Sequence, residues 1–408
     1  QKQRLAHSEF QNIGARQLLV STRAAKKLTG IIMCSQLIVG CDNDSDAKTQ
    51  HTLNLNETNS SLAIFSERTL INTTAVYQEI DLLNESIALF LSEPTEENRA
   101  ALGDSWAKSH GALVKSGTQP LSDELSAKHS SSLLYHADAW PIQPGYIDAI
   151  DGYPNSGIVN DITVSLSVES LRLQHGFSDA DEIILGFHPL EYLIFAKNAI
   201  DYQLPEHKQQ PDKTNISKAK GTGDEQTTSA TLTTGFERPD EDPIYRRRKL
   251  IQLLGDALEE SVSTYLAARL EKVPYAKFVG EDQQHAALAV ANLIEVSRSH
   301  TSQGFEESNL LLDSDQSHSM YSRTSHLNIS QRLNSLSEML NEPIWLSRSL
   351  ARVDKNIEKD LQATLAEGML IIESNQFNES DGARLLTIFS ALNHQLEDIQ
   401  LKLFAAND

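Results

Sequence analysis

Residues 186–195 have the sequence GFHPLEYLIF, in which a histidine and a glutamate interrupt an otherwise apolar run. The spacing of three residues between His188 and Glu191 places both side chains on one face of a helix. Burying an imidazole and a carboxylate among aliphatic and aromatic neighbours is costly unless a partner, such as a metal ion, satisfies them. Imidazole nitrogen together with carboxylate oxygen suits zinc or iron better than calcium or magnesium. This run therefore predicts a helix on which His188 and Glu191 bind a transition metal.

Length and composition favour an all-α protein with room for two domains. The chain has 408 residues, of which 39% are hydrophobic and only 6% aromatic. A chain of this length can bury a substantial core, and its richness in Leu, Ala, Ser and Glu favours helices. The net charge of −21, without any basic stripe, argues against nucleic acid as a partner.

The N-terminal part of the chain has the pattern of a secretory signal. Basic residues at 23–27 precede the apolar run 28–40, and Cys41 follows directly. This ending is similar to a bacterial lipobox, in which Cys41 would carry the lipid anchor, although a buried helix with free thiols is the alternative. Residues 1–41 are therefore predicted to be an upstream extension plus lipoprotein signal peptide, and the polar residues 42–60 a flexible tether. The protein is expected in the cell envelope, anchored to a membrane and facing the periplasm, with the inner or outer membrane left open.

Apolar periodicity divides the remaining chain into two helical halves. We predict two tandem helical bundles of about four helices each, at 61–200 and 244–408, joined by the polar linker or insert 201–243. The run quoted above lies in a signature helix expected from about Ser178 to Ile200, which Pro189 should kink. Further helices are predicted at 62–91, from 96 onward, and at 243–272, 282–300, 326–342, 346–374 and 380–405.

Several segments together resemble the imelysin-like family, whose signature is Gly-x-His-x-x-Glu. The segments are Ala139–Pro141, Tyr146–Asp148, Asp151–Gly152, Ser156–Asp161, Gly186–Glu191, Tyr245–Arg248, His318–Ser322 and His326. Members of this family are bacterial envelope proteins tied to iron uptake, and they are also classed as peptidases. The resemblance covers roughly residues 60–405 and implies a site near the interface of the two bundles. It implies Gly186, Asp151, His318 and His326 as residues that line this site.

Three functional hypotheses follow for His188 and Glu191. The first is an envelope lipoprotein that binds a transition metal for uptake, iron being favoured and zinc the alternative, with an iron-uptake permease or receptor as a partner. The second is a zinc metallopeptidase of the imelysin type, in which His188 and Glu191 would hold zinc or Glu191 would be the general base. The His-Glu-x-x-His pattern of common zinc peptidases is absent. The third is a structural or docking pair without metal.

The other histidines carry a weaker signal. A second His-x-x-Glu pair, His394 and Glu397, is predicted to lie on the solvated face of the last helix. His110, His136 and His300, each taken singly, are expected to be surface residues or satisfied residues within helices.

Overall fold

The computed structural model describes residues 55–116, 135–204, 241–271, 283–310, 317–340, 355–373 and 379–404. They all belong to one compact unit, His51–Asp408. Within these ranges the chain is helical, apart from turns and one isolated bridge between Ile150 and Tyr153. The all-α prediction is thereby confirmed. The predictions for the signal segment, Cys41, residues 42–54 of the tether and most of the insert 201–243 lie outside the described residues. Residues 55–60, predicted as part of the tether, belong to a helix.

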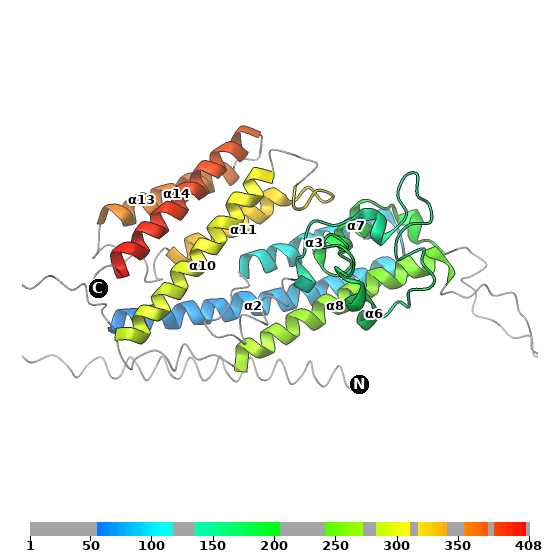
Figure 1. Ribbon diagram of the computed structural model, residues 1–408, viewed down its shortest axis with the longest axis horizontal. Helices are drawn as coiled ribbons and strands as arrows, with labels where there is room; N and C mark the ends of the chain where they lie inside the picture. Colours follow the sequence, from blue (N-terminus) through cyan, green and yellow to red (C-terminus); the bar gives the residue numbers. More distant parts are fainter. Residues whose placement is uncertain are drawn as a thin grey trace, which may run out of the picture. The chain divides into compact units, whose positions relative to one another are not determined.

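The helices fall close to the predicted positions (Figure 1). Helix α2 begins earlier than expected, and α10 continues ten residues beyond its predicted end at 300. None of the helices in the described ranges is both long enough and apolar enough to cross a bilayer. In chain order the elements are α2 (Leu55–Ser92), α3 (Glu96–Ser116), α5 (Pro144–Ile147), α6 (Val168–Gln174), α7 (Phe187–Phe195), the 3₁₀ turn η1 (Ala199–Tyr202), α8 (Pro243–Glu271), α10 (Gln283–Leu310), α11 (Ser325–Leu340), α13 (Lys355–Ile372) and α14 (Glu379–Phe404).

The buried apolar side chains of the described residues form two clusters. The first lies among α2, α3, α7, α8 and the loops of 135–204, and the second among α10, α11, α13 and α14. Figure 1 shows α2 running beside α8, and α14 beside α10. Helix α8 was grouped by sequence with the second half, yet its buried side chains, such as Leu250 and Leu254, belong to the first cluster. The division into two bundles therefore stays a prediction.

The signature helix is shorter than predicted, and Pro189 does not kink it. Helix α7 spans only Phe187–Phe195. Pro189 occupies its first turn, where a backbone N–H has no partner within the helix, so the missing donor costs nothing. The predicted start at Ser178 is wrong because the chain from there to Gly186 forms turns, and Gly186 has a φ of 104°, which does not continue a helix.

A basic segment at the start of α8 fixes the long loop that leads toward α7. The buried Arg246 guanidinium donates hydrogen bonds of 2.7–2.9 Å to four carbonyl oxygens, those of Ile158, Val159, Asp161 and Val164. Arg247 pairs through Nε with Oδ2 of the fully buried Asp148 at 2.5 Å. These contacts hold an irregular loop rigid, since its inward carbonyl groups would otherwise be buried without partners.

Candidate metal centre

Three histidines from separate parts of the chain meet beside the start of α7. His110 lies on α3, His188 on α7, and His318 in the turn before α11. One ring nitrogen of each lies within 4.8 Å of those of the other two. The ring centroids of His188 and His318 are 4.3 Å apart, and those of His110 and His188 are 5.3 Å apart. The group therefore joins elements of the first apolar cluster to the turn that begins α11.

Asp138 lies between two of these imidazoles. Its Oδ1 is 2.9 Å from His110 Nε2 and 3.2 Å from His188 Nε2. Donor atoms bound tetrahedrally at zinc–ligand distances of 2.0–2.1 Å are about 3.3 Å apart, so these spacings are close to those of a ligand set. Burial opposes ionisation of Asp138, but the charge and hydrogen bond of His110, with help from His188, hold its pKa well below the usual range. The carboxylate is therefore ionised where a cation would bind.

Glu191 holds His188 from the other side of the ring. Its Oε1 accepts hydrogen bonds from the backbone N and the Oγ of Ser322, at 2.8 and 2.7 Å. Its Oε2 lies 3.4 Å from His188 Nδ1. Burial lowers the pKa of His188, but the nearby carboxylates of Asp138 and Glu191 outweigh this effect and raise the pKa to about 9. Glu191 thus orients the imidazole through Nδ1 and leaves Nε2 directed at Asp138, an arrangement common among metal-binding histidines.

Helix α7 is positioned by a close approach of backbones. A Cβ on Gly186 would lie 2.6 Å from the carbonyl oxygen of Ala137, next to Asp138. Trp106 donates from Nε1 to the carbonyl of Phe187 at 2.8 Å, and its ring stacks on His110 at 5.0 Å. The glycine therefore brings His188 and Asp138 together, and the tryptophan links α7 to His110. Trp106 is fully buried.

Three ring nitrogens of this group have no hydrogen-bond partner among the described residues. They are His110 Nδ1, His188 Nε2, whose approach to Asp138 is not aligned as a hydrogen bond, and His318 Nδ1. Burial and the charge of His188 hold the pKa of His318 well below its usual value, so its ring is neutral. A buried imidazole nitrogen without a partner is costly, and a cation bound by such a nitrogen would satisfy it. The residues present therefore fit a transition metal.

The site residues expected from the sequence are only partly brought together. His188, Glu191 and His318 are adjacent, and Gly186 caps the helix that carries two of them. Asp151 lies exposed in a turn, and the half-buried His326 is not part of the three-histidine group. The prediction that Glu191 shares a cation with His188 is not tested directly, but Ser322 already occupies one of its oxygens.

Two residues of the centre were missed by sequence reasoning. His110 was expected to be a surface or satisfied histidine, and Asp138 was not considered. The signal for His110 is its spacing of four residues from Trp106, which puts both on one helical face. Asp138 immediately precedes the Ala139–Pro141 segment that carries the family resemblance.

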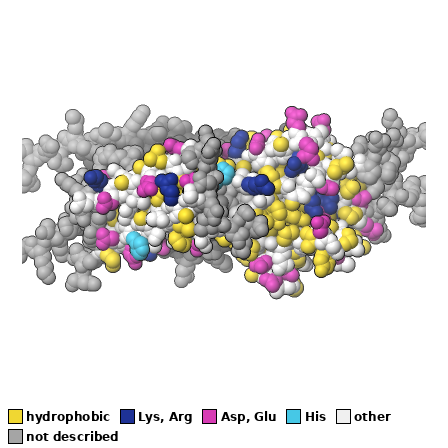
Figure 2. Space-filling model, turned by 90° about the horizontal axis from the view of Figure 1, so that it is seen from above, with side chains coloured by type: hydrophobic (Ala, Val, Ile, Leu, Met, Phe, Trp, Pro, Cys, Tyr) yellow, Lys and Arg dark blue, Asp and Glu magenta, His cyan; other side chains and the backbone are white. Residues whose placement is uncertain are grey.

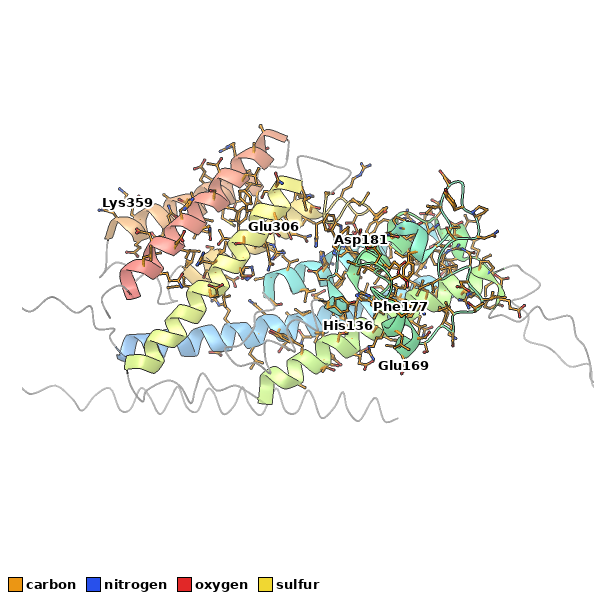
Figure 3. The ribbon with its side chains drawn as sticks, viewed as in Figure 1. His136, Glu169, Phe177, Asp181, Glu306 and Lys359 are labelled. Carbon is orange, nitrogen blue, oxygen red and sulfur yellow. The ribbon has the colours of Figure 1, made fainter. Side chains whose placement is uncertain are left out.

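Three further histidines considered in the sequence lie outside the three-histidine group. The ring centroids of His136 and His175 are 5.7 Å apart, and Figure 3 labels the position of His136. His300 is buried on α10, with Nε2 3.4 Å from Ser335 Oγ. His394 and Glu397 are exposed at the surface of α14, as predicted.

A pocket of about 280 Å³ opens onto the histidines. His188, Glu191 and His318 form its polar side. The remaining lining residues are apolar or aromatic, namely Trp140, Pro141, Ile142, Met320 and Tyr321. Figure 2 shows hydrophobic side chains gathered on one half of the face seen there. A small ligand could therefore reach the histidines from this pocket.

The model of the imelysin family matches residues 72–397. The chain belongs to the imelysin family. Its fold is similar to that of an imelysin-like protein from Psychrobacter arcticum 273-4, with a TM-score of 0.55 and 14% identity over 90% of this chain and 98% of that one. It is also similar to a "putative iron-regulated protein A precursor" from Parabacteroides distasonis ATCC 8503, with a TM-score of 0.60 and 10% identity over 89% of this chain and 98% of that one. No curated protein sequence matches significantly.

Proposed function

We propose that this imelysin-family protein binds a transition metal through His110, His188, His318 and Asp138. The observation that supports this most directly is the three-histidine group, in which one ring nitrogen of each residue lies within 4.8 Å of those of the other two. The same three rings also carry nitrogens without a hydrogen-bond partner among the described residues. Three imidazoles with one carboxylate suit zinc, iron or copper and not magnesium or calcium. Iron is favoured, because a protein of similar fold is named as iron-regulated, and zinc is the alternative.

The wider role we propose is metal uptake at the cell envelope. The basic and apolar pattern before Cys41 supports a lipid anchor at that residue and a position facing the periplasm. A permease or receptor for iron would then be the partner that takes over the bound ion. Mass spectrometry of the membrane fraction tests the anchor, because a diacylglyceryl group on Cys41 adds a defined mass that Cys41→Ala abolishes.

Peptidase activity is the second candidate, since the matching family is named among the peptidases. A peptidase needs a general base within reach of a metal-bound water. Glu191 is the residue nominated for that role, yet both of its oxygens are directed at Ser322 and His188. This arrangement suits a residue that orients a ligand better than one that activates water, so binding is favoured over catalysis.

Thermal unfolding of the metal-stripped full chain tests the proposal. Wild type is compared with His318→Ala, and with His394→Ala as a control at an exposed position, in iron(II), iron(III), zinc, copper(II) and calcium. A ligand at a hundredfold excess over its Kd stabilises the folded state by about 2.7 kcal/mol, which raises the Tm measurably. We expect one transition metal to raise the Tm of wild type and of His394→Ala but not of His318→Ala. No shift with any ion would leave the structural or docking role as the explanation of the centre.

A further inference from the structure

The pocket beside the metal centre has the size of a single substituted aromatic ring. Its volume is about 280 Å³. A dry cavity of about 150 Å³ holds one benzene molecule, whereas pockets for drug-sized ligands begin at about 300 Å³. The pocket therefore exceeds what a water molecule or a bare ion needs, and one ring with two or three substituents would fill it.

The walls of the pocket suit a flat, apolar ring. Trp140 contributes an aromatic surface whose centroid lies 5.7 Å from the His318 ring, and Tyr321 contributes a second, 5.2 Å from the ring of Tyr192. Ile142 and Met320 complete the apolar lining. Aromatic rings pack favourably against such surfaces in offset or edge-to-face arrangements.

Charge decides which polar groups such a ring should carry. The described residues that line the pocket include no lysine or arginine, and the acidic Glu191 is among them. An anionic ligand would therefore find its positive partner in a metal ion held by the neighbouring histidines. Three neutral imidazoles and one aspartate leave a divalent or trivalent cation with net positive charge, which anionic oxygen donors would neutralise. In addition, an iron ion held by the four proposed ligands would have coordination positions left for an outside ligand if it were six-coordinate.

We propose that the pocket binds a single-ring aromatic chelator of the catecholate class, whose two oxygens complete the coordination of the bound metal. The inference rests on the metal site proposed above. On binding, the two hydroxyl groups form bonds to the metal and release their protons to solvent, with no change in oxidation state. The protein would then hold its metal as a ternary complex and not as a bare ion.

Catechol binding to the metal-loaded full chain tests the proposal. Protein loaded with iron(III), or with copper(II) or zinc if these bind better, is dialysed against catechol, and metal and ligand are both measured in the protein fraction. With iron, the visible charge-transfer band of the catecholate complex gives a second readout. We expect catechol and metal to be retained together in equal amounts. Loss of the metal to catechol, or retention of the metal alone, would overturn the inference and leave the metal site standing.

Two variants that fill the pocket distinguish binding of the ligand's aromatic ring from coordination by its oxygen donors. Ile142→Trp and Met320→Phe enlarge lining residues without changing any proposed ligand. We expect either variant to weaken catechol binding about tenfold or more, as steric overpacking in a closed site does, with metal affinity unchanged. Acetohydroxamate is a bidentate oxygen ligand without a ring, and it should bind wild type and variants alike. Equal catechol affinity in wild type and in a folded variant would overturn the proposal, and a wild type that binds no metal would overturn both proposals together.

Discussion

Replacement of Glu191 by glutamine tests whether Glu191 orients the ligand His188 or is itself a ligand of the metal. Glutamine keeps the size of the side chain, and its amide oxygen can still accept from Ser322, whose N and Oγ lie 2.8 and 2.7 Å from Oε1. The change removes the negative charge 3.4 Å from His188 Nδ1, which fixes the ring and raises its basicity. Loss of such an outer partner weakens metal binding by about 10–100-fold, or about 1.4–2.8 kcal/mol.

Loss of a direct ligand should cost more. Structural zinc sites with four protein ligands bind with about 10–16 kcal/mol, which corresponds to about 2.5–4 kcal/mol, or about seventyfold to several hundredfold in affinity, for each ligand. The metal affinity of His188→Ala is therefore expected to be up to several hundredfold below that of wild type. The loss of affinity in Glu191→Gln should be at least several times smaller. Competition titration against a chromophoric chelator measures both, with Glu397→Gln in the exposed His-x-x-Glu pair as the matched control.

The spectrum of bound cobalt(II) gives an independent check. If Glu191 lies outside the coordination sphere, Glu191→Gln should keep the visible bands of the wild-type complex, whereas His188→Ala should change their position and intensity. An affinity loss for Glu191→Gln as large as that for His188→Ala, together with altered bands, would show that Glu191 is a ligand and refute the assignment.

Three further outcomes are expected. Gly186→Ala should lower the free energy of unfolding by about 3 kcal/mol, because a φ of 104° is unfavourable for alanine and the new Cβ would meet the Ala137 carbonyl. Urea denaturation measures this free energy, and a change below about 1 kcal/mol would contradict the reasoning. Burial and the charge of Arg332 lower the pKa of His300 to about 3, so below pH 6.5 the unfolded chain binds a proton at this residue that the folded chain does not bind. The free energy of unfolding should therefore fall by up to about 1.4 kcal/mol per pH unit from pH 6.5 toward pH 3. The variant His300→Gln should reduce this slope. Because His188 without metal has a pKa of about 9, a metal ion that binds this ring must displace its proton. The metal affinity should therefore rise up to about tenfold per pH unit between pH 6 and pH 9. A metal affinity that does not change over this pH range would show that His188 is not a ligand.

The local part of this structure could be predicted from the sequence. Amphipathic spacing predicted most of the helices, because a helix that buries one stripe repeats its apolar residues at a fixed interval. The same rule placed His188 and Glu191 on one face, and their side chains do lie together. It failed at the start of α7, where Gly186 adopts a φ that no periodicity reveals and Pro189 is tolerated in the first turn.

The remaining members of the centre depend on tertiary contacts. His110 and Asp138 are distant from His188 in sequence, and only the packing of α3 and the loop against α7 brings Asp138 Oδ1 within 3.2 Å of Nε2 of both His110 and His188. A histidine on an amphipathic helix gives the same local pattern whether it is a core residue or a ligand. His318 was nominated through the family resemblance, since its turn has no periodicity of its own.

The electrostatics of the centre explain how it can be both a structural element and a metal site. Without metal, the raised pKa of His188 and the lowered pKa of Asp138 describe a protonated imidazole held between two buried carboxylates, Asp138 and Glu191. That proton supplies a positive charge which balances part of the charge of the two acids. A divalent metal would replace the proton with a larger charge, and His318, whose ring is neutral and whose Nδ1 has no hydrogen-bond partner among the described residues, would be a further ligand. Exchange of one proton for one metal ion would therefore allow loading and release without unfolding, as a protein that passes its metal to a partner requires.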